Sequence, residues 1–251
     1  MEDASLLIDL HRRQYRQGPG GDAETALAIT LSGLSSKSAL KVADIGCGTG
    51  ASSLLLAKEL SAKITAIDLF PEFLDALDQR ATAAGVSDRI ETRAASMSDR
   101  LFNNGSLDAI WSEGAIYNMG FENGLRAWGR FLGRGGVLAV TELTWLTEHR
   151  PQELTEHWEA EYPEVDTASA KLRLLEAHGY SPIGYFPLPR HCWLENYYRP
   201  LQDGFESFLA RHDGSDAARS VVDAERKEIA LYERYSDFVG YGFYVARKLG
   251  D

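Results

Sequence analysis

Residues 44–50 read DIGCGTG and stand between an apolar run, 41–45, and a segment with helical spacing. Glycine at alternate positions allows positive φ and lets a ligand approach the backbone closely. The amide groups at the start of the following helix then favour anionic or electron-rich ligand groups. In an open α/β sheet, ligands bind at the carboxyl ends of the strands. The stretch therefore predicts an α/β fold with a ligand site at this turn.

Asp68 ends a second apolar run, 63–67, about 20 residues beyond the glycines. At that spacing a carboxylate meets the ribose hydroxyls of an adenosine ligand. A glycine-rich turn alone is as readily a simple chain reversal, but Asp68 at this distance favours an adenosine site. The glycines also satisfy the relaxed dinucleotide pattern, which keeps NAD as an alternative. Asp44 speaks against NAD, because it would repel a pyrophosphate and suits the ammonium of a methionine group.

The remaining chain alternates short apolar runs with amphipathic segments, a pattern typical of β-α-β units around a parallel sheet. A largely helical segment of about 50 residues follows the sixth expected strand, longer than a connection usually needs. We expect strands at 41–45, 63–67, 89–93, 107–111, 137–143, 183–186 and 241–247, and helices at 6–15, 23–34, 71–84, 122–132 and 169–178, with one more after the glycines. The predicted organisation is a single domain over 1–251, with a helical cap at 1–36, a Rossmann-like core at 37–187 and 237–251, and a helical lid insertion at 188–236.

Several motifs across residues 40–145 resemble the class I S-adenosylmethionine-dependent methyltransferases. The three alternate glycines match the first motif of that superfamily. Asp68 followed by Leu69 resembles its second motif, in which the acid binds ribose and the next side chain packs on adenine. The likeness is to small-molecule members, similar to the methyltransferases of ubiquinone and menaquinone biosynthesis. It implies a Rossmann-like sheet of seven strands with helices on both faces, in which the last strand runs antiparallel between the fifth and the sixth.

Three further segments extend the resemblance. Residues 95–97 (ASM) match the segment along the adenine edge, where many relatives have an acid and Ser96 offers only a hydrogen bond. Residues 132–136 (LGRGG) resemble the turn before the fifth strand. Residues 17–20 (QGPG) resemble a loop that closes over the methionine end of the cofactor, although a plain turn between helices fits equally well. The resemblance thus implies S-adenosyl-L-methionine as the cofactor, with these binding residues: Asp44, Gly46, Cys47, Gly48, Gly50, Asp68, Leu69, Ser96, Met97, Glu113 and Gly18.

The acceptor side offers three candidate bases, which are needed if the acceptor is an OH, an SH or a protonated amine. Glu113 follows the fourth strand and Glu142 ends the fifth. Neighbouring strands lie about 4.8 Å apart, so both carboxylates are expected to face one crevice, although a surface role for Glu142 fits as well. His191 titrates near neutrality and is the third candidate. The candidate substrate-binding residues are aromatics of the rim and the insertion, unless they form the insertion's own core or a homodimer contact: Tyr117, Trp193 and Tyr197.

Composition limits the function classes. The chain has 251 residues and a formal net charge of −11, which argues against a nucleic-acid partner and gives no attraction to anionic membranes. Its two cysteines are too few for a disulfide framework, and its six histidines show no ligand-like spacing with acids, so no metal is expected. The acidic start and the lack of a long apolar run favour a cytoplasmic protein.

The sequence therefore predicts methyl transfer, by in-line displacement, to a small-molecule acceptor whose reacting atom it does not identify. Three alternatives stay open. The first is a methyltransferase that acts on RNA or protein, and the second is an NAD-dependent oxidoreductase. The third is a non-catalytic module that binds the cofactor as a sensor.

Overall fold

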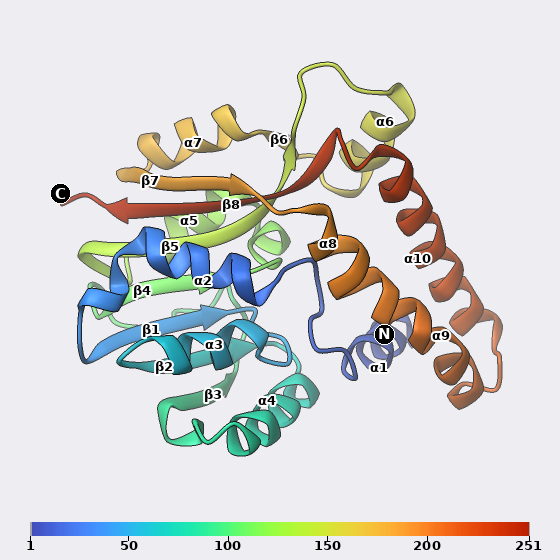
Figure 1. Ribbon diagram of the computed structural model, residues 1–251, viewed down its shortest axis with the longest axis horizontal. Helices are drawn as coiled ribbons and strands as arrows, with labels where there is room; N and C mark the ends of the chain where they lie inside the picture. Colours follow the sequence, from blue (N-terminus) through green and yellow to red (C-terminus); the bar gives the residue numbers. More distant parts are fainter. Residues whose placement is uncertain (1, 251) are drawn as a thin grey trace.

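The computed structural model describes residues 2–250, which fold around a central β-sheet flanked by helices (Figure 1). The strands are β1 (Leu40–Ile45), β2 (Ala62–Asp68), β3 (Ile90–Ala94), β4 (Leu107–Ser112), β5 (Leu132–Trp145), β6 (Asp166–Thr167), β7 (Tyr180–Pro187) and β8 (Val239–Lys248). The α-helices are α1 (Glu2–His11), α2 (Asp22–Ser32), α3 (Ala51–Glu59), α4 (Pro71–Ala83), α5 (Phe121–Gly129), α6 (Gln152–Glu161), α7 (Ala168–Ala177), α8 (Arg190–Trp193), α9 (Arg199–Arg211) and α10 (Asp216–Tyr235). Short helical turns are η1 (Leu34–Ser36), η2 (Ser87–Arg89), η3 (Ile116–Met119) and η4 (Leu194–Tyr198).

The strand order is β3-β2-β1-β4-β5-β8-β7, with the short β6 paired beside β5. Strands β1 to β5 pair in parallel, whereas β8 runs antiparallel to both β5 and β7. This confirms the expected Rossmann-like α/β sheet with its last strand between the fifth and the sixth main strands. The chain order reverses between β1 and β4, and a crevice at such a point is where open α/β sheets bind ligands.

Both faces of the sheet are covered, which explains why its strands read as nearly continuous apolar runs. Side chains of β8 alternate between the two faces. Phe243 and Val245 join the apolar cluster that includes side chains of α2, α3 and α4. Tyr244 and Ala246 join the cluster that includes side chains of α5 and α7. All four residues are fully buried, so β8 ties the two layers together.

Strand β5 is longer than the sequence predicts, since it covers residues 132–145 instead of 137–143. The segment expected to be a turn, 132–136, belongs to the strand and forms an irregularity in its pairing with β4. Gly135 has φ of +75° there, a conformation that glycine adopts without strain. Because the strand continues beyond its expected end, Glu142 lies within β5 and not at its tip.

Helices α1, α8, α9 and α10 gather beyond the carboxyl ends of the parallel strands (Figure 1). Helix α1 packs against α9 and α10, although the sequence separates them by about 190 residues or more. Residues 188–236, which we interpret from the sequence as a lid insertion, contain α8, η4, α9 and α10. Helix α6, which follows β5, was not predicted from the sequence. Within residues 2–250 no helix is long and apolar enough to cross a membrane.

Candidate functional site

The glycine loop, residues 46–50, turns sharply between β1 and α3. Its three alternate glycines have φ of +73°, +54° and +89°, which other residues adopt only with strain. The loop is also closely packed: a Cβ on Gly46 would clash with Ala115, and one on Gly50 would clash with Leu77. Backbone conformation and packing therefore both require glycine here.

Asp68, at the end of β2, is tied to the glycine loop. Its Oδ2 accepts a hydrogen bond from the amide of Gly48 at 2.8 Å, and its Oδ1 accepts one from the amide of Phe70 at 3.1 Å. Burial raises the pKa of Asp68, and these backbone amides oppose that shift. The residue keeps 9% of its surface exposed, on the side of a cavity. Its carboxylate is thus fixed in place and still accessible to a ligand.

Asp44 lies one layer deeper. It is fully buried, and its Oδ2 accepts hydrogen bonds from the hydroxyls of Ser52 at 2.7 Å and Ser53 at 2.6 Å. Its Oδ1 has no hydrogen-bond partner within residues 2–250. Burial raises the pKa of Asp44 to about 7, although the two serine hydroxyls lower it. Ser52 lines the cavity and Asp44 does not, so the hydroxyl stands between the carboxylate and any ligand.

A cavity of about 770 Å³ opens beside the glycine loop, Asp68 and the end of β4. One wall, which we call the loop wall, consists of Gln17, Gly18, Gly46, Cys47, Gly48, Asp68, Leu69, Phe70, Ser96 and Met97. The other, which we call the aromatic wall, consists of Tyr117, Trp158, Tyr162, Trp193, Tyr197 and Tyr241. Most residues predicted from the sequence line this cavity, including Glu113. Within the described chain, four do not: Asp44, Gly50, Glu142 and His191.

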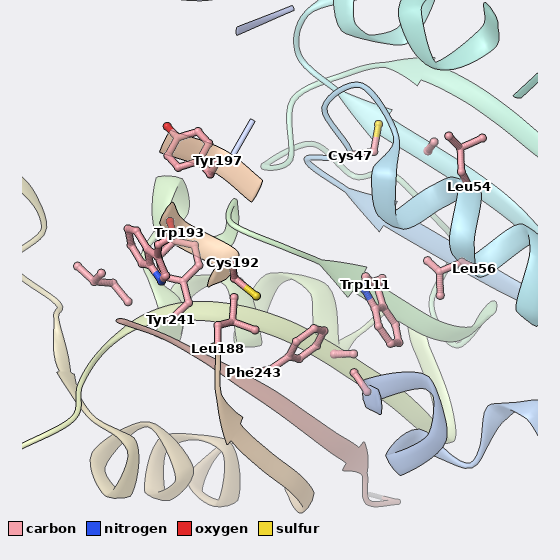
Figure 2. Close-up of a cluster of buried hydrophobic side chains, with 14 of the residues drawn as sticks. Cys47, Leu54, Leu56, Trp111, Leu188, Cys192, Trp193, Tyr197, Tyr241 and Phe243 are labelled. Carbon is pink, nitrogen blue, oxygen red and sulfur yellow. The ribbon is translucent and has the colours of Figure 1, made fainter. Parts of the chain in front are cut away.

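Two pairs of rings in the aromatic wall meet edge to face. Trp193 contacts Tyr241 with ring centroids 4.9 Å apart and planes at 67° (Figure 2). Tyr117 and Tyr162 meet in the same manner, at 6.0 Å and 70°. These residues come from η3, α8, β8 and the chain after α6, so four separate segments build this wall.

Glu113 lines the cavity, but the protein already uses both of its carboxylate oxygens. Its Oε2 accepts from Arg16 Nη1 at 2.9 Å, and its Oε1 accepts from Thr25 Oγ1 at 2.7 Å and from Trp111 Nε1 at 2.8 Å. Both members of the ion pair with Arg16 are 7% exposed. Through its ion pair with Arg16, Glu113 therefore holds the segment before Gly18 against the end of β4.

The comparisons with known proteins agree with this geometry. Residues 42–136 match the family described as a methyltransferase domain. The fold matches a SAM-dependent methyltransferase from Geobacter sulfurreducens, solved in complex with S-adenosyl-L-homocysteine, with a TM-score of 0.81 and 18% identity over 98% of this chain and 97% of that one. YjhP from E. coli gives a TM-score of 0.83 at 18% identity, over 96% of this chain and 98% of that one. Residues 42–136 are thus a methyltransferase domain, and the chain has the fold of S-adenosylmethionine-dependent methyltransferases.

Curated relatives match the chain over part of their length. A Streptomyces lasalocidi protein named geranyl diphosphate 2-C-methyltransferase is 23% identical over 57% of this chain and 45% of its own. A Streptomyces halstedii protein named methyltransferase GfsG is 28% identical over 41% of this chain and 37% of its own. The chain thus spans less than half the length of these relatives. Family and fold are confirmed as expected from the motifs.

Glu142 is fully buried within β5 and does not line the cavity. Its Oε1 lies 3.5 Å from Lys171 Nζ, which also donates to the carbonyl of Glu164 at 2.7 Å. Burial raises the pKa of Glu142 to about 7, and the charge of Lys171 opposes the shift. The structure thus pairs Glu142 with a buried cation and does not bring it to Glu113.

His191 is about half exposed, in the first turn of α8. Its Nε2 lies 3.4 Å from Glu24 Oε1 and 3.7 Å from Cys192 Sγ. The three residues bring potential metal-ligand atoms within 4.8 Å of one another. The sequence pattern did not indicate this cluster, because Glu24 comes from α2, and the expected absence of a metal stays a prediction.

Several lining residues were not among the binding residues predicted from the sequence, although Gln17 belongs to the 17–20 segment. Gln17 Oε1 accepts from the amide of Thr49 at 2.8 Å, which joins the segment before Gly18 to the glycine loop. Helix α1 contributes His11, and α10 contributes Glu225 and Glu228. These helices lie far from the motifs in sequence, so spacing could not have placed them at the site.

Proposed function

We propose that this methyltransferase transfers a methyl group from S-adenosyl-L-methionine to a small-molecule acceptor by in-line displacement. The observation that carries the proposal is a single cavity in which the loop wall and the aromatic wall enclose one space. A cofactor on the loop wall would meet an acceptor on the aromatic wall without leaving that space. Holding two reactants in line and away from water is most of what such a reaction requires.

The loop wall offers groups suited to each part of this cofactor. The Asp68 carboxylate is in position to accept hydrogen bonds from ribose hydroxyls, while Leu69 and Met97 provide apolar surface for adenine. Space is available at Gly18, where the methionine end of the cofactor is expected, since a Cβ added there would meet no atom within 4 Å. Ser52, backed by the Asp44 carboxylate, is suited to an ammonium group. When bound, the cofactor supplies a methyl group already activated on a sulfonium.

The rival functions fit the cavity less well. A dinucleotide would bring a pyrophosphate to the glycine loop, in front of Asp44, where negative charge is repelled. A nucleic-acid acceptor would oppose the net charge of −11. The enclosed aromatic wall favours a small acceptor over a protein segment. A homodimer and a cytoplasmic location stay predictions. The role of general base for Glu113, His191 or Glu142 also stays a prediction.

Calorimetric titration with S-adenosyl-L-homocysteine tests the proposal directly. We expect Asp68→Asn to weaken binding by about 10- to 100-fold, because charged hydrogen bonds contribute about 1.5–3 kcal/mol each. Asparagine keeps an oxygen that can accept from Gly48, which protects the loop. The exposed Asp75 of α4 provides a control, since Asp75→Asn removes one charge outside the cavity. Absence of binding, or equal affinity in the Asp68 and Asp75 variants, would refute the proposal.

A further inference from the structure

The cavity is rich in negative charge. Among the described residues that line it, the acids and bases other than thiol and phenol groups are five carboxylates, one guanidinium and one imidazole: Asp68, Glu113, Glu161, Glu225, Glu228, Arg16 and His11. The guanidinium of Arg16 is already paired with Glu113 and with Asp22, each at 2.9 Å. Asp68 belongs to the loop wall, and Glu161 is exposed at the rim. This leaves Glu225 and Glu228 as the carboxylates without a full counter-charge.

Glu225 and Glu228 lie three residues apart on α10, so they share one face of the helix, and like charges at this spacing repel each other. Glu228 Oε1 accepts a hydrogen bond from the Tyr198 hydroxyl at 2.8 Å, which is a neutral partner. Glu225 Oε1 lies 3.6 Å from His11 Nε2, which supplies charge only when the imidazole is protonated. Burial, and next the charge of Glu225, raise the pKa of Glu228 to about 7. A cation bound here would relieve that repulsion.

The aromatic wall lies next to these carboxylates. Glu225 contacts His11, whose ring stacks on that of Tyr197 with centroids 6.1 Å apart, and both acids line the same cavity as Tyr197. Burial, and next the negative charges of Glu225 and Glu228, raise the pKa of Tyr197. Burial also raises the pKa of Tyr241, and the negative charge of Glu228 is among the further causes. Aromatic faces attract cations, and the attraction grows when water is excluded. The acids and the rings thus favour the same kind of ligand.

Buried indole donors add a second requirement. Trp158 and Trp193 both line the cavity, and neither Nε1 atom has a hydrogen-bond partner within residues 2–250. A buried donor without a partner costs free energy, and since both nitrogens are covered in this structure, a small rotation of either ring toward a ligand oxygen would be favoured. An acceptor that carries both a cationic nitrogen and an oxygen would satisfy the carboxylates and an indole together.

We propose that the acceptor is a small amine with an oxygen substituent, held as its ammonium form by Glu225, Glu228 and the aromatic wall. This inference rests on the proposed methyl transfer. The ammonium gives its proton to the Glu228 carboxylate, which frees the nitrogen lone pair. The amine nitrogen then gains the methyl carbon as the carbon–sulfur bond breaks, and the electron pair of that bond stays on sulfur.

The inference separates this chain from its curated relatives named for geranyl diphosphate. A diphosphate would face the carboxylates of α10, and within the described lining the single guanidinium is already paired. A bridging Mg²⁺ would remove that conflict, so geranyl diphosphate with Mg²⁺ is the informative competing ligand.

Two probes of the same shape measure the charge preference. The quaternary nitrogen of choline cannot accept a further methyl group, so choline reports binding of the cation. Its neutral isostere replaces the nitrogen with carbon and keeps the hydroxyl. Both are titrated into protein saturated with S-adenosyl-L-homocysteine, by calorimetry and by tryptophan fluorescence. We expect choline to bind at least about 10-fold more tightly than the isostere, since desolvated cation–π and charge contacts favour it.

Variants on α10 locate the effect. Glu228→Gln should remove most of the preference for choline, whereas Glu233→Gln, which neutralises an exposed acid of the same helix, should leave it unchanged. Equal binding of the two probes, an unaffected Glu228→Gln variant, or binding of geranyl diphosphate with Mg²⁺ in place of choline would overturn the inference. Binding of S-adenosyl-L-homocysteine is measured first. If it fails, the proposed function fails, and if only choline fails, the amine assignment alone is lost.

Discussion

Replacing Glu113 with glutamine should destabilise the fold far more than replacing Asp22 with asparagine, although both acids pair with Arg16. The two ion pairs have the same N–O distance of 2.9 Å. They differ in burial, because Glu113 is 7% exposed and Asp22 is 55% exposed. Because both acids bind the same guanidinium at the same distance, comparing the two variants isolates the effect of burial on stability.

The magnitude follows from that difference. Removing one partner of a buried ion pair costs about 3–5 kcal/mol, whereas an exposed pair contributes about 0–1 kcal/mol. Glutamine at 113 can still accept from Thr25 and Trp111, so we expect the lower value of about 3 kcal/mol. For a chain of this size each kcal/mol shifts the melting temperature by about 2–4 °C. The melting temperature of Glu113→Gln should thus fall by about 6–12 °C, and that of Asp22→Asn by no more than about 4 °C.

Thermal unfolding followed by circular dichroism measures both variants. The double variant Arg16→Gln/Glu113→Gln should be more stable than the sum of the single changes predicts, because it leaves no unpaired buried charge. Affinity for S-adenosyl-L-homocysteine should also fall in Glu113→Gln, since Arg16 precedes Gln17 and Gly18 in the loop wall. Equal melting temperatures for Glu113→Gln and Asp22→Asn would refute the argument from burial.

Two further predictions concern the glycine loop and the acid behind it. Gly50→Ala should lower the free energy of unfolding in urea by about 2 kcal/mol or more, because it adds a clash with Leu77 to the strain at φ +89°. Gly85 also has positive φ, +69°, but a Cβ added there would meet no atom within 4 Å, so Gly85→Ala should lower the free energy of unfolding by only about 1 kcal/mol. Equal losses in the two variants would show that the Leu77 contact is unimportant. Burial raises the pKa of Asp44 from 3.8 to about 7 in the folded state, so its protonated form stabilises the fold below pH 4 and that stability is lost as the pH rises to 7. Asp44→Asn removes this titration. The difference in free energy of unfolding between Asp44→Asn and the wild type, measured in urea, should therefore shift in favour of the variant as the pH rises through that range. A difference that stays constant with pH would count against the buried carboxyl as the cause.

The loop wall could be predicted from sequence because its determinants are local. Glycines at alternate positions, and an acid at the end of the next strand, are constraints of a single βαβ unit. The structure places Asp68 against the amide of Gly48, 20 residues away, where that spacing predicts it. Backbone geometry of this kind leaves a direct record in the sequence.

The acceptor side depends on contacts that the sequence does not record. The predicted meeting of Glu113 and Glu142 assumed that both acids stand at strand tips. Strand β5 continues to Trp145, which leaves Glu142 three residues inside the strand, where it pairs with Lys171. Arg16, which pairs with Glu113, lies 97 residues before it. The sequence also indicates a largely helical segment after the sixth expected strand, without showing which acids of α10 turn inward.

The position of β8 has a consequence for the order of folding. Strands β5 and β7 are made before residues 239–248, yet they do not pair with each other and both require β8 between them. During synthesis each strand therefore presents an unsatisfied edge, which is prone to pair with other chains. The nascent protein should depend on chaperones or on low concentration during that interval, and a nascent chain stalled before Val239 should aggregate, whereas one released with β8 complete should not.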